Sequence, residues 1–161
     1  MEIYNKLNQI RLAKKSTTKE KVFSIVMAII IGLIMGLLAK IVDNLSYFIP
    51  IFTNIGDRLG IWIFVATLLA VFSYSPKLAA LKVFAFFVAM LTVYYAYTTF
   101  FLHFFPKREL IFWSICALLS PVCAYIIWYA RGIGLLSTII LTLPITTLLS
   151  EGVELRNAYL P

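Results

Sequence analysis

VFSIVMAIIIGLIMGLLAKIV, residues 22–42, is the longest apolar stretch near the amino end of the chain, and Lys40 is its only charged residue. A helix of about 20 apolar residues crosses the roughly 30 Å hydrocarbon core of a bilayer, where its backbone groups are bonded within the helix. The stretch therefore predicts a first transmembrane helix, around which the remaining chain is organised.

One face of this predicted helix is built from small residues. Ala28, Gly32 and Gly36 recur at four-residue spacing, and Lys40 is next in the same row. Small side chains at this spacing allow a second helix to approach closely, which is how membrane helices associate. We interpret the three residues as a helix-packing face. The alternative is that glycine is simply common in membrane helices.

The composition agrees with a membrane protein. The chain of 161 residues is 62% hydrophobic and 13% charged, against about 45–50% and 25% in soluble proteins. Lys and Arg outnumber Asp and Glu by 14 to 7, but they stand mainly at the ends of apolar blocks. This placement favours orientation in a lipid bilayer over nucleic-acid binding.

The predicted fold is an all-α polytopic transmembrane helical bundle of about five membrane segments in one domain, residues 22–149. After the first helix, the segments cover residues 61–74, 78–102, 110–130 and 133–149. Ser75-Pro76 ends the second, because proline cannot continue the hydrogen bonds of a helix. Pro144 interrupts the fifth, which can therefore span the membrane or re-enter it. Residues 150–161 are predicted to be a short polar tail.

The amino-terminal segment, residues 1–21, is basic, and its apolar residues recur at helical spacing. We expect an amphipathic helix on the cytoplasmic leaflet, with a disordered basic tail as the alternative. Thr17 and Glu20 form a T-x-x-E capping box directly before the apolar stretch, which predicts the start of the first spanning helix. The segment has no cleavage site of the signal-peptide type and is expected to remain as an anchor.

The positive charges predict the orientation. With the amino end inside, nine Lys and Arg residues lie on that side: Lys6, Arg11, Lys14, Lys15, Lys19, Lys21, Lys77, Lys82 and Arg131. Five lie on the other side: Lys40, Arg58, Lys107, Arg108 and Arg156. Because Lys and Arg are enriched in cytoplasmic loops, the amino terminus is predicted to be cytoplasmic. Lys82 begins close to the surface, and we expect its ammonium to reach back to water.

Four short motifs occur in order: KIVDN at 40–44, GDxxGIWIF at 56–64, SxSPxxAA at 73–80 and WYAxG at 128–132. From Lys21 to about Glu151 the chain resembles a family of small multi-spanning bacterial membrane proteins that is catalogued as a domain of unknown function. The resemblance implies a bacterial cytoplasmic-membrane protein of several helices. It implies no activity, substrate or catalytic residue.

Catalysis is disfavoured, since the chain offers no nucleophile with its base and no paired carboxylates. His103, the only histidine, stands among phenylalanines at a predicted helix end. Cys116 and Cys123 lie about 10 Å apart along one predicted helix, too far for a disulfide, and are expected to be buried and inert. No metal-ligand or cofactor-binding pattern is present, so neither metal nor cofactor is predicted. No carboxylate lies mid-span, which disfavours ion-coupled transport through an acidic relay.

Two groups of residues are candidates for a site. The aromatic side chains Tyr94, Tyr97, Tyr125 and Trp128 provide ring faces that can hold a cation or a flat apolar solute, although tyrosine and tryptophan also form belts at membrane interfaces.

The second group, Lys40, Asp43, Asp57 and Arg58, ends the first predicted helix and opens the second at the same depth. We expect a polar cluster in which Lys40 pairs with Asp57, with separately solvated helix ends as the alternative. We also expect Asp57 to lie beside the exposed N–H groups near Gly60.

Two functions are compatible with these observations. The first is a small-solute-binding or transport-associated membrane subunit. The alternative is a non-catalytic accessory protein whose Ala28/Gly32/Gly36 face binds another membrane protein or a second copy of the chain. A stoichiometric protein partner without bound small molecule in mild detergent would favour the alternative.

The topology can be tested by cysteine labelling in a chain without Cys116 and Cys123. We expect a thiol at Lys14 to react only from the inside and a thiol at Asn54 only from the outside. The opposite pattern would overturn the orientation. A thiol at Asn157 that reacts only from the inside would show that the fifth segment re-enters the membrane.

Overall fold

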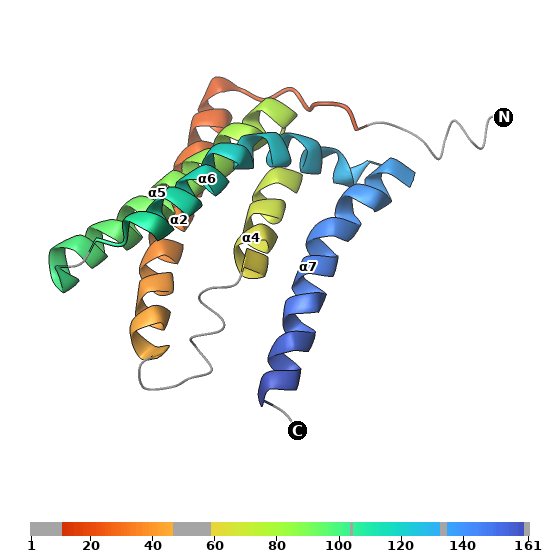
Figure 1. The fold of residues 1–161 in the computed structure, drawn as a ribbon. Helices are drawn as coiled ribbons and strands as arrows, with labels where there is room; N and C mark the ends of the chain where they lie inside the picture. The colour runs from red at the N-terminus through yellow and green to blue at the C-terminus, as the bar shows by residue number, and fades with distance from the viewer. Residues whose placement is uncertain (1–10, 47–58, 104, 133–134, 160–161) are drawn as a thin grey trace.

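The structure, a computed structural model, describes residues 11–46, 59–103, 105–132 and 135–159, and these ranges are helical apart from short connections (Figure 1). The elements are α2 (Thr18–Ser46), α4 (Leu59–Val71), α5 (Pro76–Leu102), α6 (Lys107–Ile127), the 3-10 helix η1 (Trp128–Arg131) and α7 (Leu135–Tyr159). The described ranges contain no strand, and the predicted all-α class is confirmed.

Within the described part of the chain, three helices are long and apolar enough to cross a membrane: α2, α5, and α6 together with η1. Five membrane segments are therefore more than the structure supports. Helix α4 has 13 residues and is about 20 Å long, shorter than the hydrocarbon core. Helix α7 runs without interruption through Pro144 to Tyr159, so the fifth segment does not turn back at this proline, and most of the predicted polar tail is helical.

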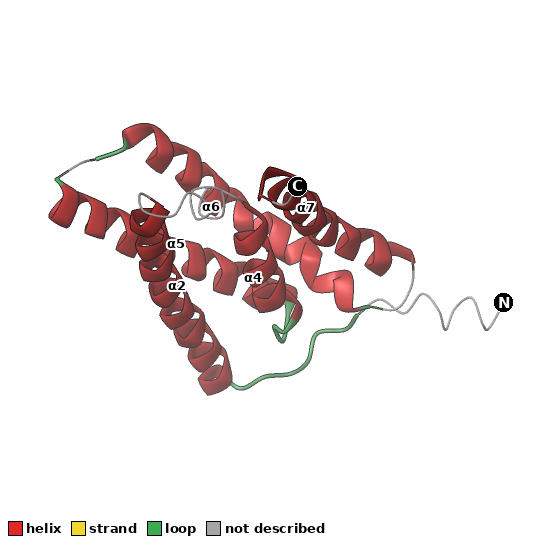
Figure 2. Ribbon diagram, turned by 90° about the horizontal axis from the view of Figure 1, so that it is seen from below, coloured by secondary structure: helices red, strands yellow, loops and turns green. Residues whose placement is uncertain are grey.

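The helices alternate in direction between two ends of the bundle (Figure 1). We name one end of the bundle the Arg11 end; helices α2, α5 and α7 begin there, and α4 and η1 terminate there. The opposite end is named the Lys40 end. Helix α4 contacts α5, α6 and α7, and Figure 2 shows it in the middle of the arrangement. Two helices that are not consecutive, α2 and α5, form the most extensive contact.

The outward faces of the spanning helices are apolar. Examples of exposed large side chains are Leu33, Ile34 and Leu38 on α2, Leu81 and Val88 on α5, and Leu118 and Val122 on α6. Apolar exposure on this scale suits a surface in contact with lipid chains. Cys116 and Cys123 are free thiols, as expected, but Cys123 is exposed on the same outward surface, so the expectation that both are buried is wrong.

Local sequence signals set two helix starts. The Thr17 backbone N–H donates to the Glu20 carboxylate at 2.8 Å, as the capping-box prediction requires, and α2 begins at the next residue. At the start of α5, the Ser75 hydroxyl accepts from the Leu78 N–H at 3.3 Å, and Pro76 occupies the first helical position, where no N–H is needed.

The small-residue face of α2 packs on α5 of the same chain. A methyl group on Gly32 would collide with the Phe86 carbonyl oxygen, and one on Gly36 would collide with the Met90 carbonyl oxygen. Ala28, in the same row, is fully buried. In this structure the face is therefore covered by α5 of the same chain, and binding of another membrane protein through it stays a prediction.

We expect Gly36→Ala to lower the free energy of unfolding by about 1–3 kcal/mol, since the added methyl group meets backbone that cannot rotate away. Thermal unfolding in mild detergent measures this. Gly152→Ala on α7 is the matched control: no atom lies within 4 Å of the added group, so the change should be neutral or stabilising by up to about 1 kcal/mol. Equal tolerance of both substitutions would contradict the contact.

Candidate functional site

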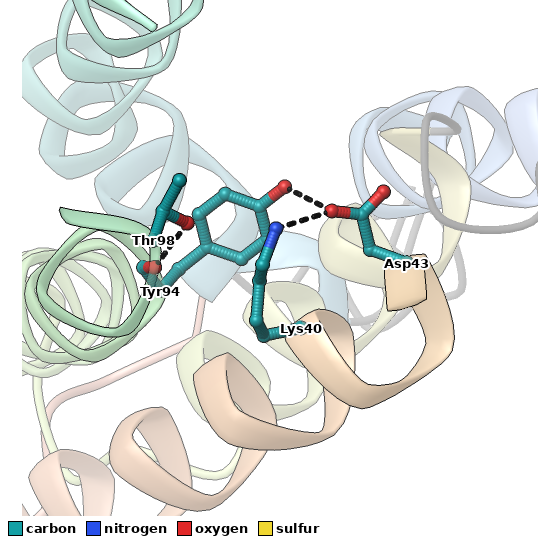
Figure 3. A network of polar contacts seen from close by, with 4 residues as sticks. All are labelled: Lys40, Asp43, Tyr94 and Thr98. Carbon is teal, nitrogen blue, oxygen red and sulfur yellow. Dashed lines mark hydrogen bonds and ion pairs between the residues drawn. The ribbon is translucent and has the colours of Figure 1, made fainter. Parts of the chain in front are cut away.

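At the Lys40 end, the last turns of α2 meet the second half of α5 through a polar cluster (Figure 3). The Lys40 Nζ lies 2.6 Å from the Asp43 Oδ2, and the Tyr94 hydroxyl donates to the same oxygen at 3.0 Å. The ammonium also lies 4.8 Å from the centre of the Tyr94 ring, within the range of a cation–π contact. The Thr98 hydroxyl donates to the Tyr94 carbonyl at 2.8 Å.

The two charges of this cluster differ in burial. Lys40 is 5% exposed, whereas the Asp43 side chain is 42% exposed. A buried ammonium needs a paired carboxylate, while a half-exposed carboxylate is also stabilised by water. The predicted partner Asp57, like Arg58, lies outside the described residues, so the Lys40–Asp57 pair stays a prediction.

A small cavity adjoins this cluster. Its volume is about 60 Å³, and it is lined by Ala39, Trp62, Met90, Leu91, Tyr94, Tyr95 and Trp113. Ligand pockets typically measure 300–1,000 Å³, whereas a water molecule occupies about 30 Å³. The space is therefore suited to water rather than to a solute.

At the Arg11 end, the chain before α2 ties the bundle together. The Arg11 guanidinium donates to the Trp128 carbonyl at 2.7 Å and to the Ser73 carbonyl at 2.9 Å, and it lies 4.0 Å from the centre of the Trp128 ring. The Trp128 indole N–H donates to the same Ser73 oxygen at 2.8 Å. Burial, and then the nearby Arg131 charge, lower the pKa of Arg11, and an arginine remains protonated under all ordinary conditions.

These contacts change the interpretation of the amino-terminal segment. Residues 11–17 are not helical, and the Lys14 N–H donates to the Tyr74 carbonyl at 2.9 Å. Residues 1–10, on which most of the amphipathic prediction rests, lie outside the described residues. The segment that enters α2 is thus bound across the ends of α4 and η1.

The four candidate aromatic residues do not form one site. Trp128 is 1% exposed and bonded to Ser73, just before α5, whereas Tyr94 lies about 27 Å along α5 from its first residue. Tyr97 stacks on Phe101 with ring centres 4.7 Å apart. Tyr125 contacts only the edge of Tyr129 among the described rings, and it is exposed. A shared aromatic pocket is therefore excluded.

A second cavity lies at the Arg11 end, between α2, the end of α4 and the start of α5. It measures about 260 Å³ and is lined by Glu20, Phe23, Ser24, Met27, Ala28, Ile31, Leu69, Phe72, Tyr74 and Lys82. Lys82 is only 7% exposed. Within the described residues its ammonium forms neither an ion pair nor a hydrogen bond. The side chain is largely buried and lines the cavity, which differs from the predicted reach to surface water.

A second long-range carboxylate contact joins α7 to α4. The Gly60 backbone N–H donates to both carboxylate oxygens of Glu151, at 3.0 and 2.9 Å. Sequence analysis assigned this position beside Gly60 to Asp57, which lies outside the described residues. Glu151 was missed because it stood in the predicted polar tail.

Lys82 was also missed as a site residue, although the sequence carried a signal for it. An ionisable side chain inside a predicted membrane segment is a candidate functional residue, because burying it in lipid is costly. Counting Lys82 as a surface charge removed it from consideration. Among the described residues, no group of three or more His, Cys, Asp or Glu side chains comes together as a metal site.

Because Lys40 is buried and Asp43 is half-exposed, we expect the loss of each charge to change the free energy of unfolding by a different amount. Asp43→Ala leaves a buried ammonium without its carboxylate and should cost roughly 1–3 kcal/mol, less than for a fully buried pair because Asp43 is partly solvated. Lys40→Met leaves a carboxylate that water can reach, and the cost should stay within about 1 kcal/mol. Thermal unfolding of both variants in detergent tests this. A larger loss of stability for Lys40→Met than for Asp43→Ala would show that the burial of Lys40 does not decide the cost of breaking the pair.

Comparison with known proteins gives no match: no protein family model, no curated protein and no solved structure is similar to this chain. The family resemblance drawn from the sequence motifs therefore stays a prediction, and the site is interpreted from its own chemistry.

Proposed function

We propose that this chain is a small-solute-binding membrane protein that serves transport, and that its solute carries a negative charge. The observation that supports the proposal is the Lys82 ammonium in the cavity between α2 and α5. This cavity is about four times as large as the one beside the Lys40 cluster, and its lining includes a largely buried lysine.

Lys82 is 7% exposed and has neither an ion pair nor a hydrogen bond within the described residues, so its charge is largely removed from water. This is unfavourable, and proteins rarely retain such a group unless it has a task. An anionic group beside Lys82 would be attracted to the ammonium and offset its unfavourable burial. The low polarity of the surroundings would strengthen this attraction. The Ser24 and Tyr74 hydroxyls, which also line the cavity, can donate hydrogen bonds to the same group.

The cellular setting belongs to the proposal as well. We place the protein in the cytoplasmic membrane of a bacterium with its amino terminus inside, supported by the nine-to-five distribution of Lys and Arg and by the family resemblance. The accessory-protein alternative has less support, because α5 covers the Ala28/Gly32/Gly36 face on which it depended.

We expect Lys82→Met to raise the free energy of unfolding of the ligand-free protein by about 1–3 kcal/mol, because it removes a largely buried charge that has no partner among the described residues and keeps the length of the side chain. Hexyl phosphate should raise the unfolding temperature of the wild type by several degrees and that of Lys82→Met very little. Thermal unfolding in a non-ionic detergent measures both effects.

Lys77→Met is the matched control, since Lys77 is exposed on the same helix. It should change stability by no more than about 0.5 kcal/mol and leave the response to hexyl phosphate intact. Hexanol, which lacks the charge, should not stabilise the protein. An equal response of the wild type and Lys82→Met to hexyl phosphate would refute the proposed function.

A further inference from the structure

The Lys82 cavity is lined by two kinds of side chain, polar and apolar. Its polar groups come from four residues, Glu20, Ser24, Tyr74 and Lys82, whereas the other lining side chains are apolar. A molecule that complements such a lining has a charged group and a hydrocarbon part. This pattern favours an amphiphile over a small hydrophilic anion.

The cavity also opens on the surface that faces lipid. Phe23 and Phe72 line it and are 68% and 65% exposed, and Met27 lines it and is partly exposed as well. The Arg131 guanidinium lies 5.2 Å from the centre of the Phe72 ring, so the opening is basic on its α4 side and apolar on its α2 side. The α2 side, over Phe23 and Met27, thus provides a lateral route for a hydrocarbon chain.

The depth of Lys82 matches a lipid headgroup. It follows the first residue of α5 by about 9 Å along the helix, and a long helical side chain leans back toward the amino end of its helix. The ammonium is therefore directed toward the Arg11 end of the bundle, where a lipid headgroup would lie in the proposed orientation. Glu20, the one acidic residue of the lining, accepts hydrogen bonds from the Thr17 N–H and hydroxyl at 2.8 and 2.9 Å.

We infer that the solute of this cavity is a phospholipid taken from the surrounding bilayer, with its phosphate paired to Lys82 and an acyl chain lying over Phe23 and Met27. This inference rests on the proposed binding function and adds the identity of the ligand class. Lysine binds phosphate as a point charge, and the pairing needs no second basic residue in the cavity.

The test is lipid retention by the purified chain, measured by native mass spectrometry after incubation with phosphatidylglycerol or with diacylglycerol of the same acyl chains. The wild type should retain one phosphatidylglycerol and no diacylglycerol. Lys82→Met should weaken retention of phosphatidylglycerol at least about tenfold, and Lys77→Met should leave it unchanged. Met27→Trp, which fills the cavity and keeps the Lys82 ammonium, should weaken retention of phosphatidylglycerol to a similar extent. This variant tests the inference if Lys82→Met does not fold.

Three results would overturn the inference. Equal retention of diacylglycerol would show an apolar lipid contact without phosphate recognition. Equal retention by the wild type and both cavity variants would place the lipid elsewhere. Stabilisation of the wild type by inorganic phosphate as large as by phosphatidylglycerol would identify free phosphate as the source of the anion.

The outcome separates the two proposals. A Lys82-dependent response to hexyl phosphate without retained phospholipid leaves the binding function standing and removes the lipid as its ligand. Absence of both effects removes both proposals.

Discussion

The close contact between α2 and α5 fixes most of the geometry described above. It depends on the absence of side chains at Gly32 and Gly36, which brings the α2 backbone against the Phe86 and Met90 carbonyls. In lipid no hydrophobic force drives helices together, so close packing of this kind has to supply the association. The two helices are not consecutive in the chain, and this contact sets their register.

The register then determines the surroundings of two lysines, Lys40 and Lys82. Moving four residues along each helix from Gly36 and Met90 leads to Lys40 and Tyr94, whose ammonium and ring are in contact. Moving four residues back from Gly32 and Phe86 leads to Ala28 and Lys82, which line the same cavity. A single helix contact thus brings the Tyr94 ring and hydroxyl to the Lys40–Asp43 pair of α2, and it leaves Lys82 beside a methyl group. The small Ala28 side chain leaves space that a larger one would fill.

Sequence signals predicted what is local and missed what is distant. The start of α2 follows from Thr17 and Glu20, and the start of α5 follows from Ser75-Pro76, because each involves neighbours within one turn. The spacing of Gly32 and Gly36 indicated a packing face but could not identify α5 as its partner. The hydropathy of the sequence also indicated more membrane spans than the structure supports. It reports the length of an apolar segment and cannot distinguish a spanning helix from a short helix packed among others.

The site was harder to predict for the same reason. Trp128 at the end of an apolar segment has the pattern of an interfacial anchor, and its burial depends on Ser73 and Arg11, which are far away in the sequence. The burial of Lys82 depends on α2 lying against α5. The burial of Trp128 and of Lys82 is not encoded in a short motif. Periodicity and composition could therefore indicate these two residues but not the side chains around them.

Helix α4 shows how these distant contacts allow a short helix to sit inside the bundle. It is about 10 Å shorter than the hydrocarbon core, and the polar groups at its ends cannot all be left to water. Glu151 accepts from the Gly60 N–H at its amino end, while Arg11 and Trp128 donate to the Ser73 carbonyl just beyond its carboxyl end. A carboxylate at the positive end of the helix dipole and a guanidinium at the negative end are each favourable. The non-helical segment before α2, residues 11–17, and the polar half of α7 are therefore held in place by the short helix whose ends they complete.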